Sequence, residues 1–175
     1  DLVLLHWPFG NYYAAWRELE KLHQEGKIRA IGVSNFDPDR LIDLIEFNQV
    51  APAVNQIETH LLCQRRTEHE WMEKYHVRHM AYAPLGQGRK NEMFENPALV
   101  EIARAHGKTS AQVALRFLMQ SGVVVIPKSV HKGHIKENFD IFDFELTADE
   151  MAQLVKMDTA VPMIGNPENP AVVEV

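Results

Sequence analysis

Five short apolar runs in this chain each end in polar residues and lead into a helical segment. Strands and helices that alternate in this way predict repeated βα units with parallel strands. Polar residues at the carboxyl ends of parallel strands are typical of a (β/α)₈ barrel, whose active sites lie at that edge. Five strands cannot close such a barrel, so we expect an α/β fold that holds about five of its βα units. The runs are residues 2–5 before His6, 31–33 before Ser34 and Asn35, Val54 before Gln56 and Glu58, 80–82, and 123–127 before Lys128.

Composition predicts one cytoplasmic domain. The 175 residues are 46% hydrophobic and 24% charged, as in ordinary globular proteins. A net charge of −6 argues against a nucleic-acid partner, because such proteins usually carry a basic face. No apolar run reaches the roughly 20 residues of a membrane span, and the single cysteine, Cys63, favours a reducing compartment. A strand that starts directly after Asp1 indicates a truncated start.

Helices are expected between these strands from the spacing of apolar residues and from capping residues. Asp37 before Pro38 predicts a helix start at which the Asp37 side chain accepts backbone N–H groups. Thr109 with Gln112, and Thr147 with Glu150, predict capping boxes. The expected helices cover about residues 12–22, 38–45, 67–75, 97–106, 111–120 and 135–139, with a last one after Thr147.

The polar residues at the first three strand ends are candidates for chemistry, but each has a structural alternative. His6 could donate a hydrogen bond to a carbonyl group, or it could be a satisfied structural histidine. Ser34 and Asn35 could bind an amide or a sugar, or they could cap the helix that starts at Pro38. Gln56 and Glu58 share a face of their strand and could both point toward a ligand, although buried glutamines commonly satisfy the backbone instead.

The later strand ends carry an aromatic ring and a local cationic stretch. Tyr82 could stack on a planar ligand or pack the barrel rim. Lys128 and Ser129 lead into a segment rich in His and Lys, which is a plausible phosphate site at a helix start or simply a solvated face. The sequence shows no Gly-rich nucleotide fingerprint and no His/Cys cluster with metal-ligand spacing, so we expect no metal.

In this order, these motifs resemble those of the aldo-keto reductases across essentially all 175 positions. Within the family, the motifs are similar to those of the bacterial branch that reduces 2,5-diketo-D-gluconate or methylglyoxal. The matching segments are DLVLLHWP at 1–8, GKIRAIGVSNF at 26–36, VNQIE at 54–58, AYAPLG at 81–86, and IPKSV at 126–130 with Glu137 and Asn138 beyond.

The resemblance implies that the chain forms the last five βα units of a (β/α)₈ barrel. It also implies an NAD(P)H-dependent carbonyl reductase that acts on a small aldehyde or ketone. The complete protein is expected to be a monomer. Residues 1–175 would then be an NADP-dependent oxidoreductase domain without its amino-terminal part. The residue matching His6 orients the carbonyl group, and Trp7 and the tail from Ala160 shape the substrate pocket. The implied contacts at the nicotinamide end are Ser34, Asn35 and Gln56 to the carboxamide, with Tyr82 stacked on the ring. Lys128, Ser129 and His134 would contact the adenosine phosphates, Glu137 and Asn138 the adenine, and Leu85 is a further cofactor contact.

Two departures from the family pattern qualify these expectations. The catalytic Asp, Tyr and Lys of the family lie upstream of the strand that carries His6, so the isolated chain is expected to be inactive. A non-catalytic truncated barrel that binds at most a nucleotide or a partner is therefore the alternative. Histidines also stand at positions 131 and 134, where family members that prefer NADPH commonly carry Arg. NADPH with weakened discrimination against NADH is the expected cofactor.

Overall fold

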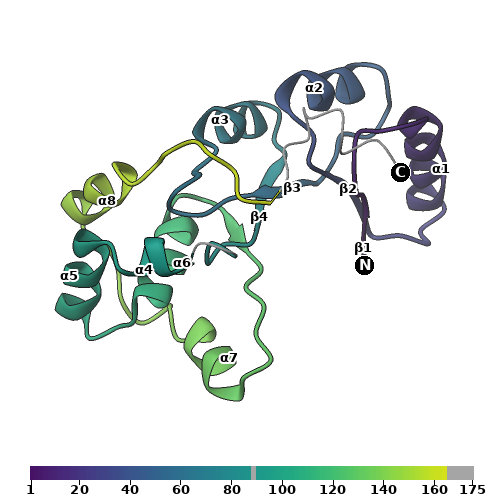
Figure 1. The fold of residues 1–175 in the computed structure, drawn as a ribbon. Helices are drawn as coiled ribbons and strands as arrows, with labels where there is room; N and C mark the ends of the chain where they lie inside the picture. The colour runs from purple at the N-terminus through teal and green to yellow at the C-terminus, as the bar shows by residue number, and fades with distance from the viewer. Residues whose placement is uncertain (88–89, 165–175) are drawn as a thin grey trace. The chain divides into compact units, whose positions relative to one another are not determined.

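The computed structural model describes residues 1–87 and 90–164, and its strands form one sheet in the order β1-β2-β3-β4-β5 (Figure 1). Within this part of the chain, the strands are β1 (Leu2–Leu5), β2 (Ala30–Ser34), β3 (Val54–Glu58), β4 (Arg78–Tyr82) and β5 (Val124–Val125). The helices are α1 (Tyr12–Gln24), α2 (Pro38–Glu46), α3 (Arg66–Lys74), α4 (Lys90–Phe94), α5 (Pro97–His106), α6 (Ser110–Gln120), α7 (Lys132–Phe139) and α8 (Ala148–Val155).

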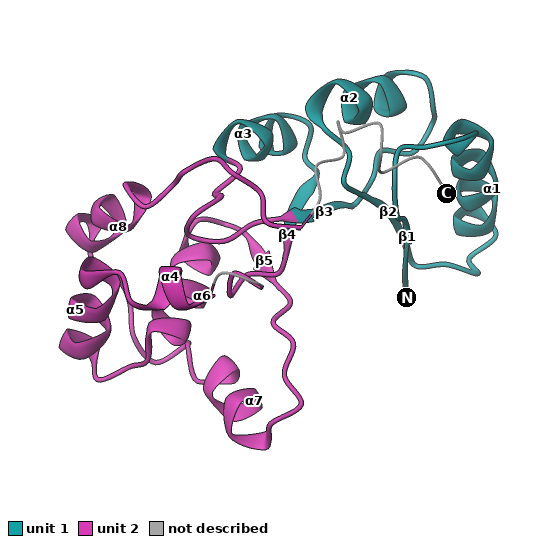
Figure 2. Ribbon diagram, viewed as in Figure 1, with its two compact units in different colours: residues 1–57, 66–80, 165–175 teal, residues 58–65, 81–164 magenta. Residues whose placement is uncertain are grey.

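The chain divides into two compact units, shown in two colours in Figure 2. Of the described residues, unit 1 contains 1–57 and 66–80, and unit 2 contains 58–65 and 81–164. Unit 1 holds β1, β2 and α1 to α3, and unit 2 holds β5 with α4 to α8. The boundary between the units falls after Ile57 in β3 and after Met80 in β4.

Most elements agree with the sequence predictions. All five strands are present, and both predicted capping boxes, Thr109 with Gln112 and Thr147 with Glu150, are formed. The helix α4 was not expected, because its five residues are too few for an apolar period to show. The prediction for Asp37 was wrong in detail: it is the N-cap of α2, but its side chain makes no capping hydrogen bond.

Unit 1 has its core between the strands and their helices. Trp16 of α1 and Leu44 of α2 are fully buried, together with Ile31 and Val33 of β2. Because side chains alternate along a strand, Ile31 and Val33 share the face that packs against the helices. The Trp16 indole N–H donates to the Val50 carbonyl at 3.1 Å, which satisfies the polar atom of this buried ring.

The opposite face of β2 carries Gly32, where the neighbouring strands approach closely. A Cβ atom at Gly32 would lie 2.8 Å from Leu4 Cδ2 and 2.7 Å from Val54 Cγ2. Leu4 pairs with Gly32 in the parallel register of β1 and β2. A larger residue would force these side chains apart, so glycine allows the close packing of the three strands on this face of the sheet.

Unit 2 has a separate apolar core. Val113 and Phe117 of α6 pack in it with Leu99 of α5 and Leu154 of α8, all at most 2% exposed. Cys63 is also buried, in agreement with a structural role for this thiol.

Glu58 fixes the last described residues of unit 2. This carboxylate is 1% exposed and accepts hydrogen bonds from the Met163 amide at 2.5 Å and the Ile164 amide at 2.9 Å. Nε2 of His60, itself fully buried, lies 3.1 Å from Glu58 Oε1. Burial alone would raise the pKa of Glu58, but the hydrogen bonds from His60 and the two amides outweigh burial and lower the pKa below its ordinary value of 4.5.

The Glu58 contacts predict a specific dependence of stability on pH. A carboxylate whose pKa is lowered on folding stabilises the fold above its unfolded pKa, and this contribution is lost as the pH falls through the folded pKa. Glu58→Gln should therefore lower the free energy of unfolding at pH 7 by about 1.5–3 kcal/mol, a typical value for hydrogen bonds to charged groups. The loss should shrink as thermal unfolding of the whole protein is followed from pH 7 to below pH 4.5. Glu46→Gln, at an exposed position of α2, is the control and should have little effect.

Candidate functional site

Three of the predicted site residues meet at the carboxyl ends of the strands in unit 1. Ser34 and Gln56 are direct partners in the parallel register of β2 and β3. His6 follows β1, whose last residue, Leu5, pairs with Val33. Because residues two apart share a face, His6, Ser34 and Gln56 continue the face that holds Leu4, Gly32 and Val54.

Asn35 connects these strand ends. Its side-chain amide donates to the His6 carbonyl at 3.1 Å and to Ser34 Oγ at 3.2 Å, and Ser34 Oγ donates to the Gln56 carbonyl at 2.7 Å. The backbone of Asn35 is left-handed, with φ at 60°, a conformation that asparagine tolerates better than most residues. Ser34 and Asn35 are 2% and 4% exposed. Both are held by strand-end contacts, and the N-cap of α2 is Asp37 instead.

Gln56 and Glu58 lie in different surroundings despite their shared face. Gln56 is half-buried, and its amide donates to the Met80 sulfur at 3.2 Å. Glu58 is buried among the amides of Met163 and Ile164, so it serves the backbone rather than an open ligand site.

His6 and Trp7 are accessible, as a site for a small molecule requires. His6 is exposed and Trp7 is half-buried. The Trp7 ring stacks on Phe9 with ring centroids 5.6 Å apart and an interplanar angle of 5°, and His6 contacts Trp7 at the same centroid distance. The part of the tail beyond Ile164, which was expected to shape the same pocket, lies outside the described residues.

Tyr82 ends β4 in unit 2 and is half-buried. Burial, and next the nearby Glu58 carboxylate, raise the pKa of Tyr82 to about 12, so its phenol keeps its proton throughout the physiological range. Ala83 follows with a left-handed backbone, φ 49°, and the chain turns sharply there. A neutral ring at a turn is suited to stacking rather than to proton transfer.

The six remaining predicted cofactor residues lie together around one cavity in unit 2. The cavity has a volume of about 690 Å³, which is in the range of ligand pockets. Its walls include residues of the segment after β4, of the start of α6, of the segment after β5, and of α7. The predicted residues in these walls are Leu85, Lys128, Ser129, His134, Glu137 and Asn138.

Sequence reasoning missed several other residues of this cavity. Lys90, Asn91 and Phe94 of the short helix α4 line it, as do Thr109 and Ser110 at the start of α6. The capping box at Thr109 was a signal for this helix start, but nothing in the sequence places α4 beside it. Lys90 brings a second ammonium group to the walls that hold Lys128. The ring of Phe94 and the amide of Asn91 line the same cavity. Such a lining fits a ligand with phosphates and a planar base.

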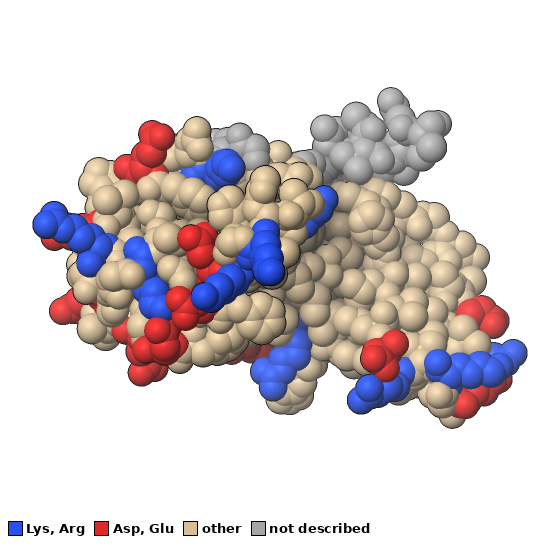
Figure 3. All heavy atoms as spheres, turned by 90° about the horizontal axis from the view of Figure 1, so that it is seen from below, with Lys and Arg blue, Asp and Glu red and all other residues tan. Residues whose placement is uncertain are grey.

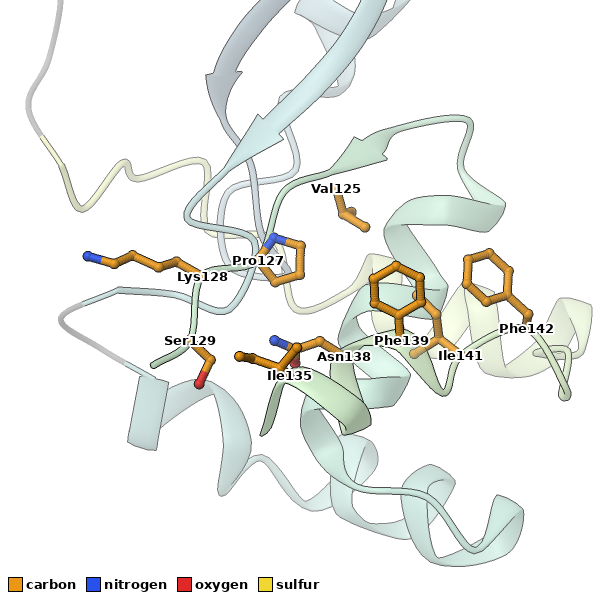
Figure 4. Close-up of a pocket in the computed structure, with 9 residues that line it drawn as sticks. All are labelled: Val125, Pro127, Lys128, Ser129, Ile135, Asn138, Phe139, Ile141 and Phe142. Atoms are coloured by element: carbon orange, nitrogen blue, oxygen red, sulfur yellow. The ribbon is translucent and has the colours of Figure 1, made fainter. Parts of the chain in front are cut away.

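A second pocket in unit 2, shown in Figure 4, has different chemistry. Its volume is about 500 Å³, and its walls are mostly apolar. The rings of Phe139 and Phe142 lie at one end in Figure 4, whereas Lys128 extends away from them at the other. Lys128, Ser129 and Asn138 belong to both pockets. The charged and polar groups gather in the larger cavity, which is therefore the better candidate for an anionic ligand.

The surface carries charges of both signs. On the face drawn in Figure 3, Lys and Arg side chains lie among Asp and Glu side chains rather than in one continuous basic patch. No helix among residues 1–87 and 90–164 is long and apolar enough to cross a membrane. In the same part of the chain, no group of three or more His, Cys, Asp or Glu side chains is placed to hold a metal ion.

Comparison with known proteins finds reductases. The chain is 44% identical over 170 residues to 9,11-endoperoxide prostaglandin H2 reductase of Trypanosoma cruzi, covering 97% of this chain and 60% of that protein. It is 42% identical over 161 residues to methylglyoxal reductase DkgA of Escherichia coli, covering 90% and 58%. The chain thus spans about 60% of the length of these relatives.

Solved structures give the same result. An aldo-keto reductase from a deep-sea metagenome matches with a TM-score of 0.93 and 38% identity, covering 97% of this chain and 63% of that one. A silkworm (Bombyx mori) aldo-keto reductase complexed with NADPH matches with a TM-score of 0.87 and 35% identity, covering 93% and 55%. The expected fold class is confirmed: the βα units of this chain are those of part of the aldo-keto reductase barrel.

Residues 1–159 match the model of the aldo/keto reductase family, which is most of the chain. Together with relatives above 40% identity along nearly the whole sequence, this match identifies the chain as a member of the aldo/keto reductase family.

Proposed function

We propose that the whole protein reduces aldehydes or ketones to alcohols by hydride transfer from NADPH, and that NADH also serves. The observation that carries this proposal is the cavity of unit 2, where six residues expected to contact the cofactor line one space. Relatives named as reductases, and a related structure complexed with NADPH, support it. The small-molecule substrate is an aldehyde or ketone, and methylglyoxal, which gives one relative its name, is the first to test.

The residues of the cavity suit the adenosine end of a dinucleotide. Lys128 and Lys90 would attract the phosphates, and Ser129 would hydrogen-bond to them. Glu137 and Asn138 carry an acceptor and an amide, which fit the edge of adenine, and Leu85 adds apolar contact. The bound cofactor supplies the hydride, and the protein supplies its orientation.

The strand ends suit the nicotinamide end. Ser34, Asn35 and Gln56 offer hydroxyl and amide groups for the carboxamide, and their positions are fixed by the hydrogen bonds described above. Tyr82, kept neutral by its raised pKa, would stack on the ring without adding charge. Trp7 would border the substrate.

His6 would orient the carbonyl group by hydrogen bonding to its oxygen, where negative charge develops during reduction. Protonation of that oxygen needs a general acid. Tyr82 is an unsuitable acid because of its raised pKa, and Tyr13 is engaged with Asp43. As the resemblance to the family implies, we propose that an Asp, a Tyr and a Lys of the whole protein, outside residues 1–175, complete the site, and that residues 1–175 alone do not reduce carbonyls. Cytoplasmic location and a monomeric state stay predictions.

The role of His6 can be tested with methylglyoxal and NADPH. In the whole protein, His6→Ala should lower kcat by roughly tenfold or more, because donors to a developing oxyanion contribute at least this much. The control is His76→Asn, an exposed position with φ at 58° where asparagine suits the backbone, and it should leave kcat unchanged. Unchanged turnover in His6→Ala would contradict the role given to His6.

Cofactor preference is set in part at His134. A guanidinium group binds a phosphate through two hydrogen bonds and is always charged, unlike an imidazole. The whole protein should therefore prefer NADPH over NADH by less than about a thousandfold in Kd, and His134→Arg should tighten NADPH by about tenfold. NADH binding to the same variant is the internal control and should hardly change. A wild-type preference of about a thousandfold or more would refute weakened discrimination.

A further inference from the structure

Gln112 hydrogen-bonds to two different walls of the cavity without lining it. Its side chain belongs to the first turn of α6 and is buried, with 4% exposed. Its Oε1 accepts from the Thr109 amide at 2.9 Å. Its Nε2 donates to the Asp140 carbonyl at 2.9 Å, to Asp140 Oδ2 at 3.2 Å and to the Glu137 carbonyl at 3.3 Å. Thr109 and Glu137 both line the cavity, so one amide group joins the start of α6 to the end of α7.

The capping of α6 does not by itself explain a glutamine here. A capping box needs only a side-chain acceptor at the third helical position. In α8, Glu150 occupies that position and accepts from the Thr147 amide at 2.8 Å. A glutamate would therefore cap α6 equally well. What glutamine adds is the NH₂ group, and at Gln112 all of its contacts are with the carboxyl end of α7.

Lys108 reinforces the same contact from outside. Its Nζ lies 3.0 Å from Asp140 Oδ2 and 2.7 Å from Asp143 Oδ1, and it also donates to the Asp140 carbonyl at 3.3 Å. Lys108 is 10% exposed in its side chain, whereas the two carboxylates are more than half exposed. Asp140 is the C-cap residue of α7, so Gln112 and Lys108 converge where this helix ends.

The helix α7 depends on these contacts more than other helices of unit 2 do. None of its residues is buried, and its N-cap residue, His131, makes no side-chain capping hydrogen bond. Three predicted cofactor contacts, His134, Glu137 and Asn138, lie on it. A helix that packs weakly can shift, and a shift of about 1 Å takes a hydrogen bond of ordinary length out of range.

We infer that Gln112 is a positioning residue for the cofactor. Its NH₂ group holds the carboxyl half of α7 at a fixed distance from the start of α6, and thereby sets the width of the cavity that receives the adenosine end. This inference rests on the proposed function, because it assigns the cavity to a nicotinamide dinucleotide.

The test uses Gln112→Glu in the whole protein. Glutamate keeps the acceptor for the Thr109 amide, as Glu150 shows in α8, but it removes the donor and places a carboxylate beside that of Asp140. We expect the Kd for adenosine 2′,5′-bisphosphate, a probe of the adenosine end alone, to rise by roughly tenfold. The KM for NADPH should rise in parallel, while kcat at saturating NADPH stays within about twofold of wild type.

Gln64→Glu is the matched control. Gln64 is another buried glutamine of unit 2, and its amide donates to the carbonyls of Leu61 at 3.0 Å and of Leu154 in α8 at 2.9 Å. The Gln64→Glu variant therefore loses amide hydrogen bonds equivalent to those of Gln112, but to α8, which does not line the cavity. It should lower thermal stability but leave the Kd for adenosine 2′,5′-bisphosphate unchanged.

Two further variants separate positioning from misfolding. Adding Asp140→Asn to Gln112→Glu supplies an amide donor opposite the new carboxylate and should recover part of the lost affinity. Lys108→Met removes only the outer contacts and should weaken binding by about threefold, even if Gln112→Glu does not fold.

The outcomes distinguish this inference from the function on which it rests. If wild-type protein binds adenosine 2′,5′-bisphosphate but neither Gln112→Glu nor Lys108→Met weakens binding, the inference is wrong and the proposed function stands. Equal weakening in Gln64→Glu would also overturn it, because a general loss of stability would then be sufficient. If the wild-type protein binds neither this probe nor NADPH, the proposed function and the inference both fail.

Discussion

The in-register parallel pairing of β1, β2 and β3 is the constraint on which the candidate site in unit 1 depends. Parallel strands end at the same edge of a sheet, and alternation of side chains decides which residues face inward there. Gly32 allows the strands to approach closely, and the left-handed turn at Asn35 then lets one amide bond to two strand ends. Small changes in register would turn Ser34 toward the helices and remove the candidate carboxamide contact.

The candidate site in unit 2 is held together differently, because its cavity is lined by helix ends and loops rather than by strand ends. Only two residues of β5 are paired as a strand, and the contacts expected for the cofactor follow it on an irregular segment and on α7. Such segments need side-chain hydrogen bonds to hold them, since they have few regular backbone partners of their own. Gln112 and Lys108 supply these bonds at the end of α7. Glu58 does the same for the segment at Met163.

Sequence patterns predicted the strands and most helices, because these depend on local periodicity, whereas the choice of candidate cofactor residues rested on the resemblance to the family. The capping boxes at Thr109 and Thr147 are local in the same sense. The long-range partners of buried polar groups were not predictable: the Glu58 carboxylate bonds to amides 105 and 106 residues away. Likewise, Gln112 was identified only as a capping residue, since its contacts with α7 depend on how two helices pack.

In the proposed function, the cavity between α6, α7 and the segment after β5 receives the adenosine end of NADPH. Hydrogen–deuterium exchange of the whole protein with and without NADPH tests this claim, because bound ligand slows exchange where it contacts or steadies the backbone. We predict slower exchange at residues 109–112 and 128–138 when NADPH is bound. NADPH binding that leaves exchange in both segments unchanged would contradict the claim.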